Sequence, residues 1–369
     1  MKILQVTRQF LPSIGGIEMV VDGLSSALQD AGHNIEIVTL QKMFSTNERA
    51  PDHSVVNGIA VTRMKHWGPK RYAIAPQVMR YARNYDVLHI HGVDFFVDFL
   101  SRTRFLHGRP IVLSTHGGIF HTKWLSSFKS AYFRTVTRQS LKNVAAVLCV
   151  SPQDYQLFSS IVPKEKLHLM PNGVAVDSYT DLKKEITPGL IVGIGRVAKN
   201  KGIDRLIHAA AKLKSTHPNS RLIWIGPDQE DRTSELRQLA ADLGVSDRFE
   251  FAGRVEHSQL RGWLQKAQAF VCGSSYESFG LSTVEAMSSG TVPVVTRVGI
   301  HPQIIEQRKS GFLVDGHPES IAQGLRSVLD LDESSLHAMG ENARLASASC
   351  SWESVVQNYI GIYQSVLAK

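Results

Sequence analysis

The stretch Ala267-Gln-Ala-Phe-Val-Cys272-Gly-Ser-Ser-Tyr-Glu277-Ser-Phe-Gly-Leu-Ser-Thr-Val-Glu285-Ala-Met-Ser-Ser-Gly290-Thr-Val-Pro-Val-Val-Thr296 decides the fold of the second half of the chain. Apolar runs at both of its ends are typical of buried strands, and the segment between them reads as a loop followed by a helix. Strand, loop, helix and strand in this order predict parallel strands joined by a crossover helix.

Two carboxylates, Glu277 and Glu285, lie in this stretch with seven residues between them. Glu277 is expected in the loop, and Glu285 in the first turn of the helix, where open backbone N–H groups attract anions. One acid can bind neutral hydroxyls while the turn holds a phosphate, and a nucleotide sugar offers both groups. The alternative is a capping box formed by Ser282 and Glu285, which explains Glu285 but not Glu277.

Short apolar strands alternate with helical segments along nearly the whole chain, which favours parallel sheets with crossover helices. Strands are expected at residues 2–7, 34–40, 86–90, 110–115 and 145–150, and again at 190–194, 221–225, 249–251, 269–272 and 292–295. This predicts an α/β protein of two doubly wound domains that face a central cleft. The expected N-terminal domain spans 1–178, a linker 179–188 and the C-terminal domain 189–350, and a last helix at 351–369 can pack back on the first domain.

Composition excludes several classes of protein. No apolar run approaches the roughly 18 residues of a membrane-spanning helix, and the N-terminus reads as a buried strand rather than a signal peptide. The three cysteines, Cys149, Cys272 and Cys350, show no metal-ligand or redox spacing. A reduced, cytoplasmic protein is the simplest inference.

The net charge of +8 is concentrated in the first half of the chain, because residues 1–180 hold 20 basic side chains against 12 acidic ones. Between Asp98 and Asp154 there is no acid at all. Within this gap, residues 121–134 alternate bases with aromatic side chains, which suits an anionic membrane surface. A nucleic-acid patch, a site for an anionic small molecule and an ordinary solvated face are the alternatives.

Each expected domain begins with a strand and a glycine-bearing turn, and ligands of doubly wound sheets bind at the carboxyl ends of the strands. Gly15-Gly16 lets a ligand approach the backbone, although a plain strand-to-helix turn explains it equally well. In the second domain, Gly193-Ile-Gly195-Arg196 runs to Lys201-Gly202. Cations beside a glycine turn fit a diphosphate better than they fit a dinucleotide fingerprint, in which the helix starts at once.

Histidines cluster at His89, His91 and His116. His89 and His91 share one face of an expected strand, as metal-binding pairs do, but no spaced carboxylate or thiol completes a site, so we expect no metal. His116 follows a strand and precedes two glycines. It is placed as a hydrogen-bond donor lining the cleft, with a structural histidine as the alternative.

Taken together, these motifs carry a resemblance. Gly15-Gly16, Pro171-Asn-Gly173, the Gly195–Gly202 turn and the Glu277–Gly290 stretch resemble, in order, the retaining glycosyltransferase family 4, which has the GT-B fold. Residues 8–18, 89–99 and 114–122 are similar to the α-mannosyltransferases of xanthan- and acetan-type polysaccharide assembly. One departure is Cys272-Gly-Ser-Ser-Tyr276 before Glu277, where the family commonly has a proline.

The resemblance implies a role for nine residues. Catalysis would fall to Glu277, His116 and Lys201. The donor would be bound by Gly16, Arg196, Lys201, Phe279, Gly280 and Glu285. Among these, Glu277 would contact the sugar hydroxyls, Glu285 the ribose, and Arg196 and Lys201 the diphosphate. Ser151 would lie near the acceptor.

The resemblance also implies an activity: transfer of mannose from GDP-mannose to a polyprenyl-diphosphate-linked oligosaccharide, with an α-linkage and without a metal or other cofactor. The expected location is the cytoplasm, at the inner face of the inner membrane, with no nucleic-acid partner. Alternatives are a UDP-sugar donor on the same fold, a nicotinamide-dependent oxidoreductase, and a non-catalytic nucleotide-sugar-binding protein. The oxidoreductase would need an acidic ribose ligand about 20 residues after the Gly193 turn, and none is present there.

Overall fold

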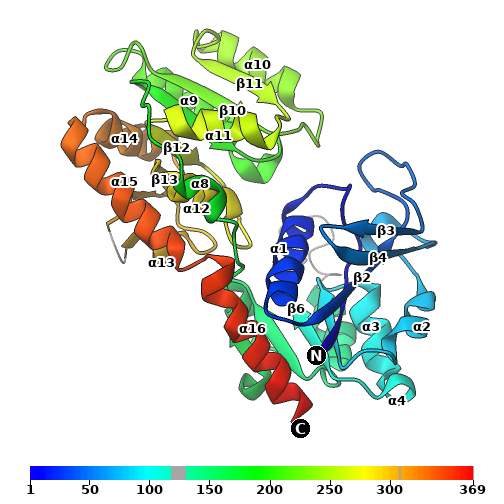
Figure 1. Cartoon of the computed structure of the whole chain (residues 1–369). Helices are drawn as coiled ribbons and strands as arrows, with labels where there is room; N and C mark the ends of the chain where they lie inside the picture. The colour runs from blue at the N-terminus through cyan, green and yellow to red at the C-terminus, as the bar shows by residue number, and fades with distance from the viewer. Residues whose placement is uncertain (118–129, 307–308, 369) are drawn as a thin grey trace. The chain divides into compact units, whose positions relative to one another are not determined.

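The computed structural model describes residues 1–117, 130–306 and 309–368 (Figure 1). The chain forms two compact units. The first combines Met1–Gly173 with Trp352–Lys369, and the second is Val174–Ser351. Within the described residues, no helix is both long and apolar enough to cross a bilayer.

The first unit contains an eight-stranded sheet in the order β3-β4-β2-β1-β5-β6-β7-β8. All neighbouring strands are parallel except β3 and β4. Its strands are β1 (Lys2–Val6), β2 (Asn34–Leu40), β3 (His53–Val56), β4 (Ile59–Met64), β5 (Val87–His91), β6 (Ile111–Ser114), β7 (Ala146–Cys149) and β8 (Leu167–Leu169). Its described α-helices are α1 (Gly16–Asp30), α2 (Met79–Ala82), α3 (Phe95–Arg102), α4 (Arg104–His107), α6 (Arg138–Leu141), α7 (Pro152–Phe158) and α16 (Trp352–Leu367).

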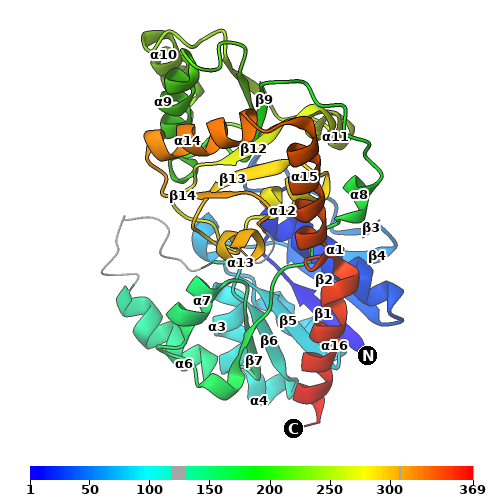
Figure 2. The ribbon, with the colours of Figure 1, turned by 90° about the vertical axis from the view of Figure 1, so that its left-hand side faces the viewer.

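Each face of this sheet carries its own core, because successive strand side chains point to opposite faces. Ile3 packs in the core that includes Leu24 of α1 and Tyr359 of α16. Leu4 packs in the other, with Phe96 of α3. Helices α1 and α16 run side by side in both views (Figures 1 and 2), and they share direct contacts.

The second unit contains a six-stranded, all-parallel sheet in the order β11-β10-β9-β12-β13-β14. Its strands are β9 (Leu190–Ile194), β10 (Arg221–Ile225), β11 (Phe249–Gly253), β12 (Ala269–Cys272), β13 (Val292–Thr296) and β14 (Phe312–Val314). Its helices are α8 (Asp177–Thr180), α9 (Ile203–Leu213), α10 (Thr233–Asp242), α11 (His257–Lys266), α12 (Leu281–Ser288), α13 (His301–Glu306), α14 (Pro318–Leu329) and α15 (Glu333–Ala348).

The segment that we expected as a linker is fastened to the second unit. Lys184 Nζ donates to the carbonyls of Leu264 and Ala267 at 2.6 and 2.7 Å, at the end of α11, and to Thr291 Oγ1 at 2.9 Å. Arg344 of α15 donates to the Leu182 carbonyl at 2.7 Å. The division between the units therefore falls after Gly173, ahead of the linker expected at 179–188.

Candidate active site

The glycine turn after β9 brings Lys201 back over the strand end. Gly195 has a φ of +153°, and a Cβ at this position would lie 3.2 Å from Lys201 Cε. The Lys199–Lys201 segment forms a 3₁₀ turn, Gly202 takes a left-handed conformation with φ +65°, and α9 begins only at Ile203. The helix thus starts later than a dinucleotide fingerprint requires, and the cation-bearing turn is what occupies the strand end.

Glu277 is held through one of its two carboxylate oxygens. Oε1 accepts from Lys201 Nζ at 2.7 Å and from Ser274 Oγ at 2.6 Å. Burial acts to raise the pKa of Glu277, but the Lys201 charge and the hydrogen bonds from Lys201 and Ser274 outweigh it and leave the pKa below its usual value. Oε2 has no hydrogen-bond partner within the described residues, so an ionised carboxylate has one fixed and one open oxygen.

The helix that follows begins without a side-chain cap. Gly280 is the N-cap of α12, with φ +115°, so Ser282 lies inside the helix and the capping box does not form. Among the described residues, the backbone N–H groups of Phe279, Gly280 and Leu281 have no hydrogen-bond partner. Open N–H groups at a helix N-terminus attract an anion.

A buried histidine supports this turn. His301 Nδ1 donates to the Thr296 carbonyl at 2.8 Å, and Nε2 accepts from Thr283 Oγ1 at 2.9 Å. A Cβ at Gly280 would lie 2.6 Å from His301 Nε2, so only glycine fits there. Phe279 is 1% exposed, and its carbonyl accepts from Ile300 N at 2.9 Å. The backbone around Phe279 and Gly280 is therefore held rigidly.

Glu285 differs from Glu277 in its protonation. Its carboxylate is half-buried and has no partner within the described part of the chain, and burial raises its pKa to about 7. Its negative charge in turn helps to raise the pKa of Tyr179. Glu277 is thus a paired, ionised carboxylate, whereas Glu285 is unpaired and titrates near neutral pH.

The predicted residues of the first unit lie after its strands. Gly16 is the first residue of α1, behind the N-cap Gly15. His116 follows β6 in the left-handed region, with φ +48°. Asp154 Oδ2 holds both of its neighbours, accepting from Thr115 Oγ1 at 2.7 Å and from Gly117 N at 2.9 Å.

Ser151, predicted near the acceptor, has a structural role. It is 1% exposed, and its hydroxyl caps α7 by accepting from Asp154 N at 3.3 Å. Arg196, predicted at the diphosphate, is exposed, and its guanidinium donates to the Gln229 side chain.

The clustered histidines bind one another and other side chains of the protein. His91 Nδ1 and His116 Nε2 lie 2.8 Å apart, and His91 Nε2 lies 2.7 Å from Gln5 Oε1. His89 contacts Tyr363 and Ser114. Burial lowers the pKa of His89 to about 3 and that of His116 to about 4, so both are neutral at pH 7. No group of three or more metal-ligating side chains is present in the described regions.

Comparison with known proteins accounts for both halves of the chain. Residues 14–178 match the family model described as Glycosyltransferase Family 4, and residues 180–346 match that described as Glycosyl transferases group 1. A relative from Xanthomonas campestris is 34% identical over 100% of this chain and 97% of its own length. It is called GDP-mannose:cellobiosyl-diphosphopolyprenol alpha-mannosyltransferase.

The chain belongs to glycosyltransferase family 4. Relatives of the same name from Xanthomonas oryzae and Komagataeibacter xylinus are 36% and 33% identical to this glycosyltransferase, over 97% and 94% of their own lengths and all of its chain.

Solved structures confirm the GT-B fold. Sucrose-phosphate synthase from Thermosynechococcus elongatus matches with a TM-score of 0.78 at 20% identity, covering 100% of this chain and 99% of its own. Anabaena HepE in complex with UDP and glucose matches with 0.78 at 18% identity, covering 99% and 100%.

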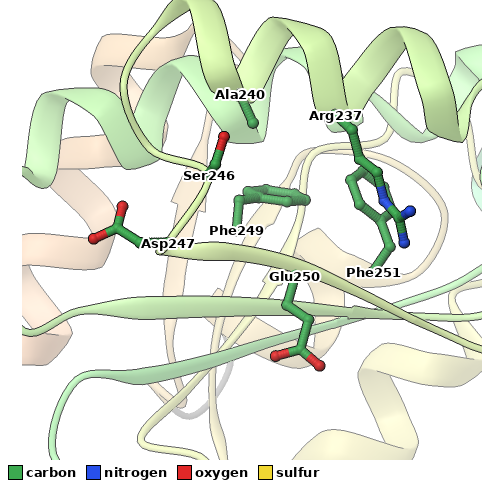
Figure 3. A pocket seen from close by; sticks show the side chains of 7 residues that line it. All are labelled: Arg237, Ala240, Ser246, Asp247, Phe249, Glu250 and Phe251. Atoms are coloured by element: carbon green, nitrogen blue, oxygen red, sulfur yellow. The ribbon is translucent and has the colours of Figure 1, made fainter.

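A pocket of about 370 Å³ lies elsewhere in this glycosyltransferase, at the outer edge of the second sheet (Figure 3). It is lined from α10 and β11 and the loop between them, and Arg237 lies over the Phe251 ring, 6.0 Å from its centroid. None of the predicted site residues lines it.

Sequence reasoning missed two side chains that hold the predicted ones. Ser274 stands three residues before Glu277, a spacing that favours a local hydrogen bond and could have been noticed. Asp154 gives no such signal, because its partners lie 37 and 39 residues away.

The basic and aromatic stretch at 121–134 lies mostly outside the described residues. At its described end the aromatic side chains point inward: Tyr132 donates to Asp98, and Phe133 is 3% exposed against Phe158. Arg134 and Arg138 are exposed. At this end Asp98 and the core thus take up the aromatic groups, and the two arginines remain exposed.

Proposed function

We propose that this glycosyltransferase transfers mannose from GDP-mannose, with retention, to a polyprenyl-diphosphate-linked oligosaccharide in bacterial exopolysaccharide assembly. The relatives that carry this donor and acceptor in their name are 33–36% identical over all of the chain, which supports the proposal.

The observation that carries the proposal is the contrast between Glu277 and Glu285 on either side of the open N-terminus of α12. The open Oε2 of Glu277 accepts hydrogen bonds from hydroxyls of the transferred sugar. The negative charge of the ionised carboxylate favours a positively charged sugar in the transition state. The Glu285 carboxylate accepts hydrogen bonds from the ribose hydroxyls. The N–H groups of Phe279 and Gly280 receive the phosphate between them.

The departing nucleoside diphosphate carries the largest charge in the reaction. Arg196, Lys201 and the α12 N-terminus can neutralise it, and Gly16 lets the backbone of α1 approach it, so the proposed step uses no metal ion. Lys201 is bound to Glu277 in the free protein, and it exchanges part of that interaction for the diphosphate. His116 contacts the reacting sugar. Ser151 is buried, so its role on the acceptor side is indirect: its hydroxyl caps α7 and thereby holds that helix in place.

The test is incubation with labelled GDP-mannose and a lipid-linked disaccharide, followed by linkage analysis. We expect an α-linked mannosyl product, with turnover unchanged by EDTA and lost in Glu277→Gln. A UDP-sugar donor is the second candidate, because HepE, which shares the fold, is also solved with UDP-glucose. Transfer from UDP-glucose or UDP-N-acetylglucosamine, but not from GDP-mannose, would contradict the mannosyl assignment.

We further propose that the protein associates peripherally with the anionic cytoplasmic face of the inner membrane. In support, Arg102, Arg104 and Arg138 are exposed in the acid-free stretch, and Phe105 is 82% exposed among them. Cosedimentation with vesicles should increase with acidic lipid and decrease with salt, and Phe105→Ser should weaken it. Binding that ignores both lipid charge and salt would contradict this proposal.

A further inference from the structure

A chain of hydrogen bonds leads from the central strand of the first unit to His116. Gln5 of β1 is completely buried, and its Oε1 lies 2.7 Å from His91 Nε2. His91 of β5 is 2% exposed, and its Nδ1 lies 2.8 Å from His116 Nε2. The planes of the two imidazole rings differ by only 22°.

The direction of these bonds follows from the chemistry of the atoms. A carbonyl oxygen can only accept, so His91 Nε2 must carry a proton. A neutral imidazole carries one proton, so His91 Nδ1 is an acceptor. The proton between the rings therefore belongs to His116 Nε2, and His116 Nδ1 has a lone pair with no partner among the described residues.

We propose that Gln5 and His91 are positioning residues that hold His116 in its Nε2–H tautomer, so that His116 Nδ1 accepts a hydrogen bond from a hydroxyl of the sugar substrate. The nature of that substrate rests on the proposed function, whereas the tautomer does not. His116 was expected as a donor. The chain of bonds makes its open nitrogen an acceptor instead.

The orientation of the Gln5 amide decides the direction of the whole chain. Its Nε2 makes no hydrogen bond of normal geometry among the described groups, but the amide interacts with the Tyr363 hydroxyl and acts to lower that phenol's pKa, which burial raises. An N–H group facing the phenol oxygen has this effect. In the structure the carbonyl oxygen of Gln5 is the amide atom that faces His91 Nε2, at 2.7 Å.

The backbone, as well as the ring contact with His91, holds His116 in place. A non-glycine residue in the left-handed region is strained and persists only where its surroundings determine it. Asp154 supplies that restraint by binding Thr115 and Gly117 on either side. Burial also lowers the pKa of all three histidines, so each ring is neutral at pH 7 and carries a single proton.

The tautomer can be measured directly in the full-length protein labelled with ¹⁵N-histidine. We expect the His116 ring, assigned by its loss in His116→Gln, to show a protonated Nε2 and an unprotonated Nδ1 at pH 7.5. Gln5→Leu should abolish this preference. Gln5→Glu, whose carboxylate can only accept, should retain it. A protonated Nδ1 in the wild-type protein would overturn the proposal.

Turnover provides the second readout. Gln5→Leu should lower kcat about 10-fold with an unchanged KM for the donor, and Gln5→Glu should restore most of it. The matched control is Gln268→Leu, which makes the same change at another buried glutamine, whose side chain accepts from the Gly189 backbone N–H in the second unit and contacts no histidine of this chain of bonds. It should keep both the tautomer and kcat.

Equal losses of kcat in Gln5→Leu, Gln5→Glu and Gln268→Leu would indicate a merely structural effect and overturn the proposal. If no nucleotide sugar is turned over by the wild-type protein, yet the tautomer is as stated and is lost in Gln5→Leu, the positioning is upheld and the proposed function fails. The two failures are therefore distinguishable.

Discussion

Glu277 and Glu285 are the same side chain eight positions apart, and their surroundings give them opposite acid–base behaviour. Lys201 and Ser274 compensate the burial of Glu277 and lower its pKa. Nothing in the described structure does so for Glu285, and its pKa rises to about 7. An unpaired, half-buried carboxylate lowers stability, and the proposed role of Glu285 at the ribose would explain why it is retained.

Glu285→Gln should stabilise the protein above neutral pH and weaken donor binding. The folded state holds the Glu285 proton more tightly than the unfolded state, so this residue's contribution to stability falls as pH rises from about 4.5 to about 7. The variant lacks that loss. We expect a gain on the order of 1–3 kcal/mol at pH 8 and little at pH 4.5, measured by thermal unfolding.

GDP-mannose affinity provides the companion measurement. In the wild-type protein it should rise with pH through about 7, as Glu285 ionises, and in Glu285→Gln it should be lower and flat. A variant that binds the donor as tightly as the wild type across this range would exclude Glu285 from the ribose site.

Lys201→Met should destabilise the protein, because it leaves the Glu277 carboxylate without its cation. The two side chains are only 12% and 14% exposed, and removing one partner of a buried pair costs about 3 kcal/mol. Donor turnover should be lost as well. Lys199→Met, in the same 3₁₀ turn but exposed, is the matched control, and equal effects of the two variants would refute the pairing.

At the scale of elements, α16 is attached to the first unit by a contact that depends on two glycines. A Cβ at Gly23 of α1 would lie 2.2 Å from Trp352 Nε1, and one at Gly173 would lie 2.2 Å from Trp352 Cδ2. The indole ring therefore occupies the space that two absent side chains leave open.

Gly23→Ala should destabilise the first unit by about 1–3 kcal/mol, because the Trp352 ring must move out of its place. The matched control is Gly361→Ala, in α16, where a Cβ would meet nothing within 4 Å. Alanine favours a helix more than glycine does, so this control should gain about 0.5–1 kcal/mol. Chemical denaturation of both variants tests whether the free energy of unfolding decreases in Gly23→Ala and increases in Gly361→Ala.

Some elements were predictable and others were overlooked. All ten expected strands are present within one or two residues of their expected ends. Strands β3, β4, β8 and β14 were missed. Asn57-Gly58, with φ of +50° and +80°, forms the β3–β4 turn, and that pair is a strong hairpin signal that was not used. Strands β8 and β14 have three residues each, too short for a periodic pattern.

At the scale of the whole molecule, the first unit is built from both ends of the chain. Six side chains of α16 are buried against it: Val355, Val356, Tyr359, Ile360, Tyr363 and Val366. The second unit is continuous in sequence, and a parallel bridge between Val174 and Ser351 joins its ends.

Removal of residues 352–369 should therefore unfold the first unit, since it uncovers the α1 face of the sheet and takes Tyr363 from His89. We expect a large loss of soluble protein and of one cooperative unfolding transition. Removal of 368–369, which lie beyond α16, is the control. A soluble truncated protein with unchanged thermal unfolding would contradict this role for α16.

The two α/β halves and the family follow from the sequence alone, because strand alternation and glycine-bearing motifs are local patterns. The expectation that Glu285 lies in the first turn of its helix is wrong, because α12 begins at Leu281 and has no acidic residue in its first turn. Which groups are paired depends on the tertiary structure instead. Lys201 and Glu277 are 76 residues apart, and His89 and Tyr363 are 274 apart. The protonation of Glu277, Glu285 and His116 depends on burial and on such distant partners, and no local pattern in the chain records them.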